Sequence, residues 1–291
     1  MSLTRWRETG SEFQFREHRI FVRDAGDGDQ ALLLLHGFPT ASWDFEPMWP
    51  GLTKCFARVV TLDFPGCGFS DKPRHYRYSV QEQADLVTAV LGARGIRHVH
   101  VVAHGDGVHV VGELLARAQE EGAQADVPQV LSAMLLSAPL FFESAHSLSK
   151  RLLFGSLAPL YWQLTGPRGF GRTFSSLFGA QTRPGMIELH DYWTLIGQQR
   201  GKLAVSALYR FGAERRAHRT RWLRALTEAH IPLRIVVGSD DRIAGHEMVE
   251  RCRQRFAGAD LVLLDGIGHY PHVEAPDRTL GALLAFHDAF D

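Results

Sequence analysis

The segment Ala103-His104-Gly105-Asp106-Gly107 has the spacing of a nucleophile turn, in which a reactive side chain stands between small flanking residues. Residues 98–102 before it read as a strand, and residues 108–117 after it read as a helix. A sharp turn between two such elements lifts the central side chain above the edge of a sheet, where it can attack a substrate. The central residue here is Gly105. We therefore predict that the nucleophile position has no side chain.

Asp106 offers a carboxylate directly beside this turn. Making it the central residue would place Val108 where the turn needs a glycine. The residue after a nucleophile normally contributes its backbone amide, while its side chain faces the next helix or a covering segment. A displaced nucleophile at Asp106 stays open as an alternative, which gains support if Asp106→Asn abolishes an activity that Gly105→Ala leaves intact.

Three other segments carry recognisable motifs. They are the apolar run Leu32–Leu35 followed by His36-Gly37-Phe38-Pro39, the loop Asp63-Phe64-Pro65-Gly66-Cys67-Gly68-Phe69-Ser70, and Gly268-His269 near the C-terminus. Together with the turn, these segments resemble the α/β-hydrolase superfamily over the whole chain. Residues 104–117, 179–184 and 269–276 are most similar to the branch of epoxide hydrolases and haloalkane dehalogenases. Within that branch they look most like the group of the mesoderm-specific transcript protein and its bacterial relatives.

The resemblance implies a role for each motif. His269 matches the general base, and Asp241 matches the acid of a Gly-x-x-Asp pattern that orients the imidazole and stabilises its cation. Asp240 is the alternate acid if the loop shifts by one residue. The backbone amides of Phe38 and Asp106 match the two donors of an oxyanion hole. The branch implies an aspartate as nucleophile, and this chain departs from it at that position.

The substrate class follows from the same resemblance. With an aspartate at the turn, it implies epoxides, alkyl halides or small activated esters, although Phe38 stands where dehalogenases carry a polar halide-binding residue. Epoxide opening usually needs tyrosines that protonate the leaving oxygen, for which Tyr161, Tyr192 and Tyr209 are candidates. Two roles are open for the remaining polar and aromatic residues. They can face the substrate, or they can support the structure, as His36 would by hydrogen bonds within its loop and the aromatic residues would by packing on one another. Residues expected near a small-molecule substrate are His36, Trp43, His104, Trp162, Tyr192 and Trp193.

Gly105 leaves three explanations open. The His269–Asp241 pair can activate water directly beneath the oxyanion hole, as in a triad that has lost its nucleophile. The chain can instead be a non-catalytic protein that binds a small apolar molecule or a protein partner. The glycine can also be an engineered substitution that traps a substrate. Since glycine adopts the strained backbone of such a turn without a Cβ clash, we expect the fold to be intact in each case.

No metal or cofactor is expected. His98, His100, His104 and His109 are close in sequence, but the first two lie in a strand and the last in a helix, so their side chains should point in different directions. The glycine-rich loops lack dinucleotide spacing and its downstream acid.

Composition sets the class of protein. A chain of 291 residues that is 45% hydrophobic can bury one large α/β core. Lys and Arg number 32 and Asp and Glu also number 32, so no net charge favours nucleic acid or an anionic membrane. Three cysteines without metal-ligand spacing, a polar N-terminus and no long apolar run predict a cytoplasmic protein with reduced thiols. The oligomeric state is not indicated.

The expected elements alternate between strands and helices, which predicts a doubly wound, mostly parallel sheet. Ser79 is expected to cap the helix over residues 80–94. From residue 144 to residue 229 the pattern changes to helical stretches rich in arginine and aromatic residues. We interpret these residues as a helical cap inserted into a core of residues 1–143 and 230–291. The other expected elements are a hairpin over 13–25, strands over 31–35, 58–63, 98–102, 130–137, 233–238 and 260–264, and helices near 43–54, over 108–117, around 246–256 and from 277.

Overall fold

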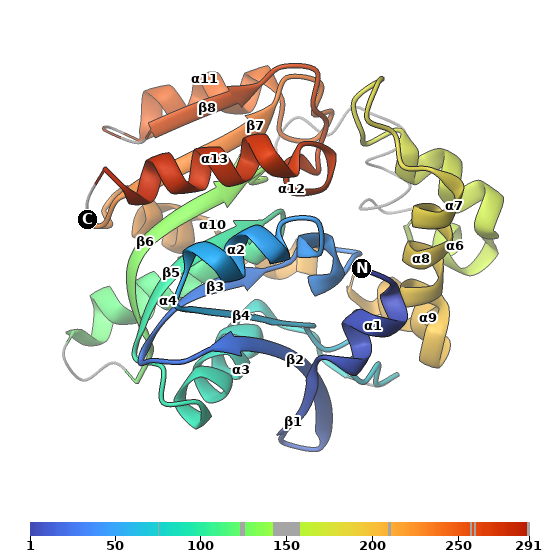
Figure 1. The fold of residues 1–291 in the computed structure, drawn as a ribbon, viewed down its shortest axis with the longest axis horizontal. Coiled ribbons are helices and arrows are strands. Elements are labelled where there is room, and N and C mark those ends of the chain that lie inside the picture. The colour runs from blue at the N-terminus through green and yellow to red at the C-terminus, as the bar shows by residue number, and fades with distance from the viewer. Residues whose placement is uncertain are drawn as a thin grey trace.

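A computed structural model describes residues 1–74, 76–122, 126–141, 158–208, 211–256, 258 and 260–289 (Figure 1). Its centre is an eight-stranded sheet with the strand order β1-β2-β4-β3-β5-β6-β7-β8. β2 is antiparallel to β1 and β4, and all other neighbouring strands are parallel. The strands are β1 (Ser11–Phe15), β2 (His18–Gly26), β3 (Gln30–Leu35), β4 (Arg58–Leu62), β5 (His98–His104), β6 (Gln129–Leu136), β7 (Leu233–Gly238) and β8 (Asp260–Leu264).

Continuous apolar strands produce a sheet that is covered on both faces. In β3, Leu33 and Leu35 belong to one hydrophobic cluster, whereas Leu32 and Leu34 belong to a second cluster on the opposite face. This alternation is the period of two that a strand imposes on its side chains. Helices contribute to both clusters. The first includes residues of α3 (Val80–Ala93), α4 (Gly107–Glu121), α10 (Phe211–Thr227) and α11 (His246–Arg255), and the second includes residues of α1 (Leu3–Glu8), α2 (Trp49–Cys55) and α13 (Pro276–His287).

The described helices are distributed around this sheet (Figure 1). They are α1 (Leu3–Glu8), η1 (Ser42–Phe45), α2 (Trp49–Cys55), α3 (Val80–Ala93), α4 (Gly107–Glu121), α6 (Ala158–Leu164), α7 (Pro167–Ser175), α8 (Met186–Gly197), η4 (Gln198–Arg200), α9 (Gly201–Leu208), α10 (Phe211–Thr227), α11 (His246–Arg255), α12 (Pro271–Glu274) and α13 (Pro276–His287). Within the described ranges, no helix is both long and apolar enough to cross a bilayer.

The predicted architecture is confirmed, because the sheet is mostly parallel and helices flank both faces. Ser79 occupies the N-cap position of α3, as predicted, but its side chain does not accept a hydrogen bond from the helix backbone. Its hydroxyl donates to Glu214 Oε1 at 2.7 Å, and the Val80 amide donates to Glu214 Oε2 at 2.9 Å. A carboxylate of α10, distant in sequence, therefore satisfies the helix N-terminus that a local serine was expected to satisfy.

Helices α6, α7, α8 and α9 lie together beyond the carboxyl ends of the central strands (Figure 1). In contrast, α10 packs on α4 on one face of the sheet. Buried Glu113 of α4 explains this docking, since it accepts a hydrogen bond from Trp222 Nε1 at 2.6 Å and forms ion pairs with Arg117 and Arg221. The boundaries of the inserted cap at residues 144 and 229 stay predictions, and residues 144–157 lie outside the described ranges.

Candidate active site

Gly105 occupies the junction between β5 and α4 with a left-handed backbone, at a φ of +52°. Its amide donates to Leu136 O at 3.1 Å, which fixes the junction against β6. A Cβ atom built on Gly105 would lie 3.5 Å from Gly37 Cα and 3.9 Å from His269 Nε2, both ordinary van der Waals distances. The position therefore has room for a side chain, and that side chain would point towards His269.

His269 and Asp241 form a buried pair at the ends of β8 and β7. His269 Nδ1 lies 3.1 Å and 3.0 Å from the two Asp241 carboxylate oxygens. The two side chains are 4% and 0% exposed, so water hardly competes for this contact. A carboxylate on Nδ1 requires a proton there, which leaves a lone pair on Nε2. The free nitrogen is the one that faces the Gly105 position.

Asp241 also serves its own loop. Its Oδ1 accepts hydrogen bonds from the amides of Ile243 at 2.7 Å and Ala244 at 3.0 Å. Burial alone would raise the pKa of the Asp241 carboxyl, but the His269 charge and hydrogen bond and these two amides outweigh it, so the pKa lies below its ordinary value. Asp241 thus combines the contact that orients His269 with hydrogen bonds that cap its own loop, whereas the alternate Asp240 is exposed.

Glu274 of α12 is a residue that the sequence analysis did not single out. Its carboxylate accepts hydrogen bonds from the amides of Gly268 at 2.8 Å and Tyr270 at 2.9 Å, on either side of His269. The same carboxylate accepts the Gly179 amide at 2.8 Å, from the loop between α7 and α8. The only sequence signal is a glutamate five residues after His269, which is weak. We call Glu274 and these three amides the Glu274 clamp.

Glu274→Gln is expected to lower the free energy of unfolding by about 1–3 kcal/mol, because the amide nitrogen of glutamine would face backbone N–H donors. Urea denaturation followed by circular dichroism measures the change. Glu228→Gln is the matched control, since Glu228 is 64% exposed and pairs only loosely with Arg224 at 3.9 Å. Equal effects of the two substitutions would contradict the stabilising role of the clamp.

The two residues expected to supply oxyanion-hole amides lie on segments that meet at the Gly37–Gly105 contact. Asp106 is the N-cap residue of α4, at the helix end where backbone N–H groups have no intrahelical acceptor. Its carboxylate forms an ion pair with Arg215 of α10 and lies 3.7 Å from His109 Nε2. That pairing gives Asp106 a structural partner and turns its side chain towards α10. Phe38 is 9% exposed.

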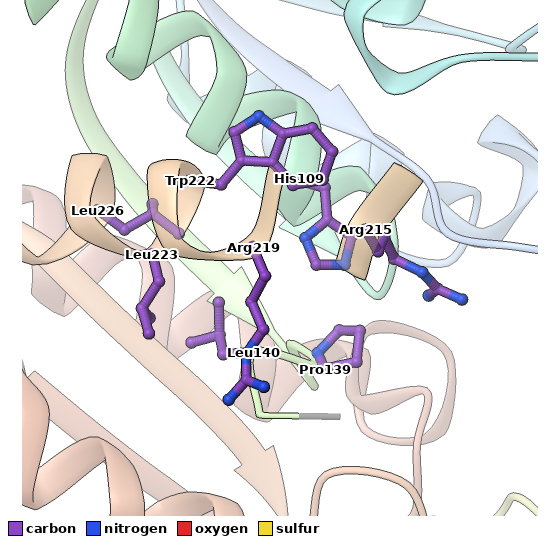
Figure 2. Close-up of a pocket in the computed structure, with 8 residues that line it drawn as sticks. All are labelled: His109, Pro139, Leu140, Arg215, Arg219, Trp222, Leu223 and Leu226. Atoms are coloured by element: carbon purple, nitrogen blue, oxygen red, sulfur yellow. The ribbon is translucent and has the colours of Figure 1, made fainter. Parts of the chain in front are cut away.

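A small cavity lies beside this ion pair, between α4, α10 and the segment after β6. Figure 2 shows its lining, which includes His109, Leu140, Arg219 and Trp222. Its volume of about 30 Å³ is enough for a water molecule and too small for an organic substrate. Burial lowers the pKa of His109 to about 4, so its contact with Asp106 is made by a neutral imidazole.

The residues expected to face a substrate differ in their surroundings. His36 is 1% exposed, and its ring nitrogens are used within its own loop, with Nε2 accepting the Phe64 amide at 3.0 Å and Nδ1 donating to Gly37 O at 2.8 Å. His104 is fully buried and donates from Nε2 to His269 O at 2.9 Å. Both histidines therefore support the site from behind. Trp43 packs edge-on against Trp6, with ring centroids 5.7 Å apart.

The aromatic residues of helices α6, α7 and α8 pack against one another in a contiguous group. Trp162 is fully buried and meets Phe38 edge-on at 6.4 Å. Tyr192 and Trp193 pack on phenylalanines of α7, with centroids 4.8 Å and 5.5 Å from Phe174 and Phe170. Burial and the nearby Asp44 charge raise the pKa of Tyr192. These contacts give the aromatic residues a packing role next to the Phe38 loop. Tyr161 packs edge-on against Trp162, and Tyr209 lies outside the described residues.

Three of the four histidines that are close in sequence, His100, His104 and His109, have different neighbours. His100 contacts Gln30 Nε2 at 2.9 Å and Ser132 Oγ at 2.8 Å, whereas His109 contacts Asp106. His104 instead lies against His272 and Tyr270, with ring centroids 4.5 Å and 4.8 Å away.

Comparison with known proteins agrees with this geometry. The family described as alpha/beta hydrolase fold matches residues 30–276. The mesoderm-specific transcript homolog protein of Homo sapiens is 34% identical over 299 aligned positions, which cover 99% of this chain and 89% of that protein. A solved membrane phospholipase A, described as a bacterial virulence factor, is 27% identical with a TM-score of 0.74, covering 98% of this chain and 89% of its own. The epoxide hydrolase CorEH has a TM-score of 0.79 at 17% identity, covering 97% of this chain and 99% of its own. The strand order, the sharp turn after β5 and the buried His–Asp pair agree with these matches: the chain belongs to the α/β-hydrolase fold family.

Proposed function

We propose that this protein hydrolyses a small ester-like substrate by direct attack of a water molecule that His269 activates. The observation that carries the proposal is the His269–Asp241 pair, whose unprotonated Nε2 faces the space above Gly105. A water molecule in that space would be close to the general base and to the amides expected to stabilise an oxyanion. The named membrane phospholipase A, at 27% identity, supports an ester as the substrate class.

The reaction has two proton transfers and no covalent intermediate with the protein. Water gives a proton to His269 Nε2 while its oxygen forms a bond to the carbonyl carbon. The resulting oxyanion accepts hydrogen bonds from the backbone amides of Phe38 and Asp106. Collapse of the tetrahedral intermediate breaks the bond to the alcohol oxygen, which receives the proton from His269. The products are a carboxylic acid and an alcohol, and Asp241 stabilises the imidazolium between the two steps.

Small epoxides are a second substrate class for the same base. Tyr192, one of the tyrosines considered as a proton donor for epoxide opening, is buried and interacts with Asp44. This engagement favours esters over epoxides in the protein with Gly105.

His269→Ala is expected to lower the rate of p-nitrophenyl acetate hydrolysis by about 10²–10⁴-fold, the usual contribution of a general base. The assay compares short p-nitrophenyl esters and styrene-oxide-like epoxides at equal protein concentration. His230→Ala is the control, because His230 is exposed at the end of the α10 segment.

Hydrolysis that survives His269→Ala would contradict the proposed mechanism. A protein that binds these compounds without turning them over would instead be a non-catalytic binder of small apolar molecules, or a trap created by the glycine.

A further inference from the structure

Three buried ionisable side chains gather behind the Gly105–His269 contact. Asp44 comes from η1, His104 ends β5, and His272 comes from α12. Each is fully buried, and one possible ligand atom from each lies within 4.8 Å of the others. His272 Nε2 is 4.0 Å from Asp44 Oδ2. We call these residues the Asp44 cluster.

Polar atoms of this cluster lack hydrogen-bond partners among the described residues. They are Asp44 Oδ1, His104 Nδ1, and His272 Nδ1 and Nε2. Leaving a buried polar atom without a partner costs about 1–3 kcal/mol, and native proteins keep few such atoms. Four such atoms in one place indicate that a bound group serves as their partner.

The neighbouring hydrogen bonds show which atoms of the Asp44 cluster have lone pairs available for a bound group. His104 Nε2 donates to His269 O at 2.9 Å, so the proton of this imidazole is on Nε2 and Nδ1 carries a lone pair. Asp44 Oδ2 accepts from the Thr40 hydroxyl, while Oδ1 keeps its lone pairs. His104 Nδ1 and the Asp44 carboxylate therefore offer lone pairs to a bound group, and His272 can offer a third from Nε2, which lies 4.0 Å from Asp44 Oδ2. A cation satisfies three lone pairs at once.

We propose that Asp44, His104 and His272 bind a divalent transition-metal ion, with zinc as the best match. Two imidazoles and one carboxylate are typical zinc ligands, and they disfavour magnesium and calcium, which select oxygen. With bonds of about 2.1 Å, two ligand atoms on one ion lie no more than about 4.2 Å apart. The 4.0 Å Asp44–His272 separation meets this limit, and a pair at the full 4.8 Å must approach by about 0.6 Å on binding.

The ion would link the three segments that build the candidate active site. Asp44 follows the His36-Gly37 loop, His104 directly precedes Gly105, and His272 is three residues after His269. The ion would act as a structural link behind the reacting groups, and the hydrolysis proposed above includes no step at the metal. The two proposals can therefore fail independently.

The test uses the full-length protein after chelator treatment and dialysis. Zinc binding is measured by competition with a chromogenic chelator, and the bound metal is counted by elemental analysis. We expect one zinc per chain, and we expect His272→Gln and Asp44→Asn to weaken binding by at least about 100-fold. His190→Gln and His230→Gln remove exposed histidines and should leave the affinity unchanged.

A second measurement does not depend on any variant. Cobalt(II) added to the metal-free protein should give the visible absorption of a four-coordinate site, because the cluster supplies three ligands and leaves one position for water. In chelator, the variants should unfold at a temperature close to that of the parent protein, because without the ion each substitution exchanges one pair of buried polar atoms for another. Zinc affinity equal in the parent and the His272→Gln protein, or cobalt that keeps its six-coordinate aqueous spectrum, would overturn the proposal.

Discussion

Gly105→Asp is expected to raise the hydrolysis of a styrene-oxide-like epoxide by at least about 10³-fold, which is well below the roughly 10⁶-fold that a serine triad loses with its nucleophile. The introduced carboxylate would project towards His269, since a Cβ at this position lies 3.9 Å from Nε2 and meets no obstruction. Its oxygen would attack an epoxide carbon and break the ring C–O bond, and the alkoxide would take a proton from water. A water molecule activated by His269 would then hydrolyse the ester. Steady-state rates of the two proteins give the comparison.

Gly105→Asn and Gly105→Ala separate nucleophilic chemistry from backbone strain. All three substitutions place a Cβ at a φ of +52° and should lose about 1–3 kcal/mol of stability. Of these three, only Gly105→Asp should gain epoxide hydrolysis. Gly105→Ser should instead gain activity on p-nitrophenyl acetate, through an acyl intermediate. A gain in Gly105→Asn equal to that in Gly105→Asp would refute the restored nucleophile.

Asp241→Asn is expected to lower esterase activity by about 10³–10⁴-fold while the fold is retained. The asparagine oxygen can still accept the Ile243 and Ala244 amides, so its NH₂ group would face His269 Nδ1. That contact needs a lone pair on Nδ1 and moves the ring proton to Nε2, which removes the general base. Measuring kcat and KM together checks the expectation that kcat carries the loss.

Asp240→Asn is the matched control, because Asp240 is the adjacent, exposed carboxylate in the same loop. It should leave kcat unchanged, and a comparable loss of activity in Asp240→Asn would move the orienting role to that residue.

The pH dependence of stability adds a second check on Asp241. The pKa of Asp241 is lower in the folded protein than its ordinary value near 4, so its contribution to stability is present above about pH 4 and is lost as the pH falls below it.

The fold and the segments that form the candidate active site are predictable from the sequence, because each has a recognisable local pattern. Leu32–Leu35 is a continuous apolar run, which predicts a doubly covered strand, and the structure buries it on both faces. The turn at Gly105 and the loop at Asp241 follow parallel strands, whose carboxyl ends meet at one edge of a sheet. Their proximity to His269 follows from topology.

Contacts between distant segments are not predictable in this way. Glu214 satisfies the α3 N-terminus from 134 positions away, and Glu274 reaches Gly179 across 95 positions. Nothing in the local pattern of Asp44 indicates that it would lie beside His104 and His272. Single-residue patterns report burial and turn geometry, whereas such pairings depend on how loops pack after the sheet has formed.

The Glu274 clamp has a thermodynamic consequence for ligand binding. One carboxylate holds both the Gly179 segment and the backbone on either side of His269. A ligand that displaces the Gly179 segment must therefore release part of the support of the imidazole. By linkage, the free energy by which the bound Gly179 segment stabilises the position of His269 equals the free energy by which a fixed His269 stabilises that segment. The position of the Gly179 segment and the placement of the base are thus reciprocally coupled, through the Glu274 carboxylate and through the hydrogen bond from the His269 amide to Leu177 O.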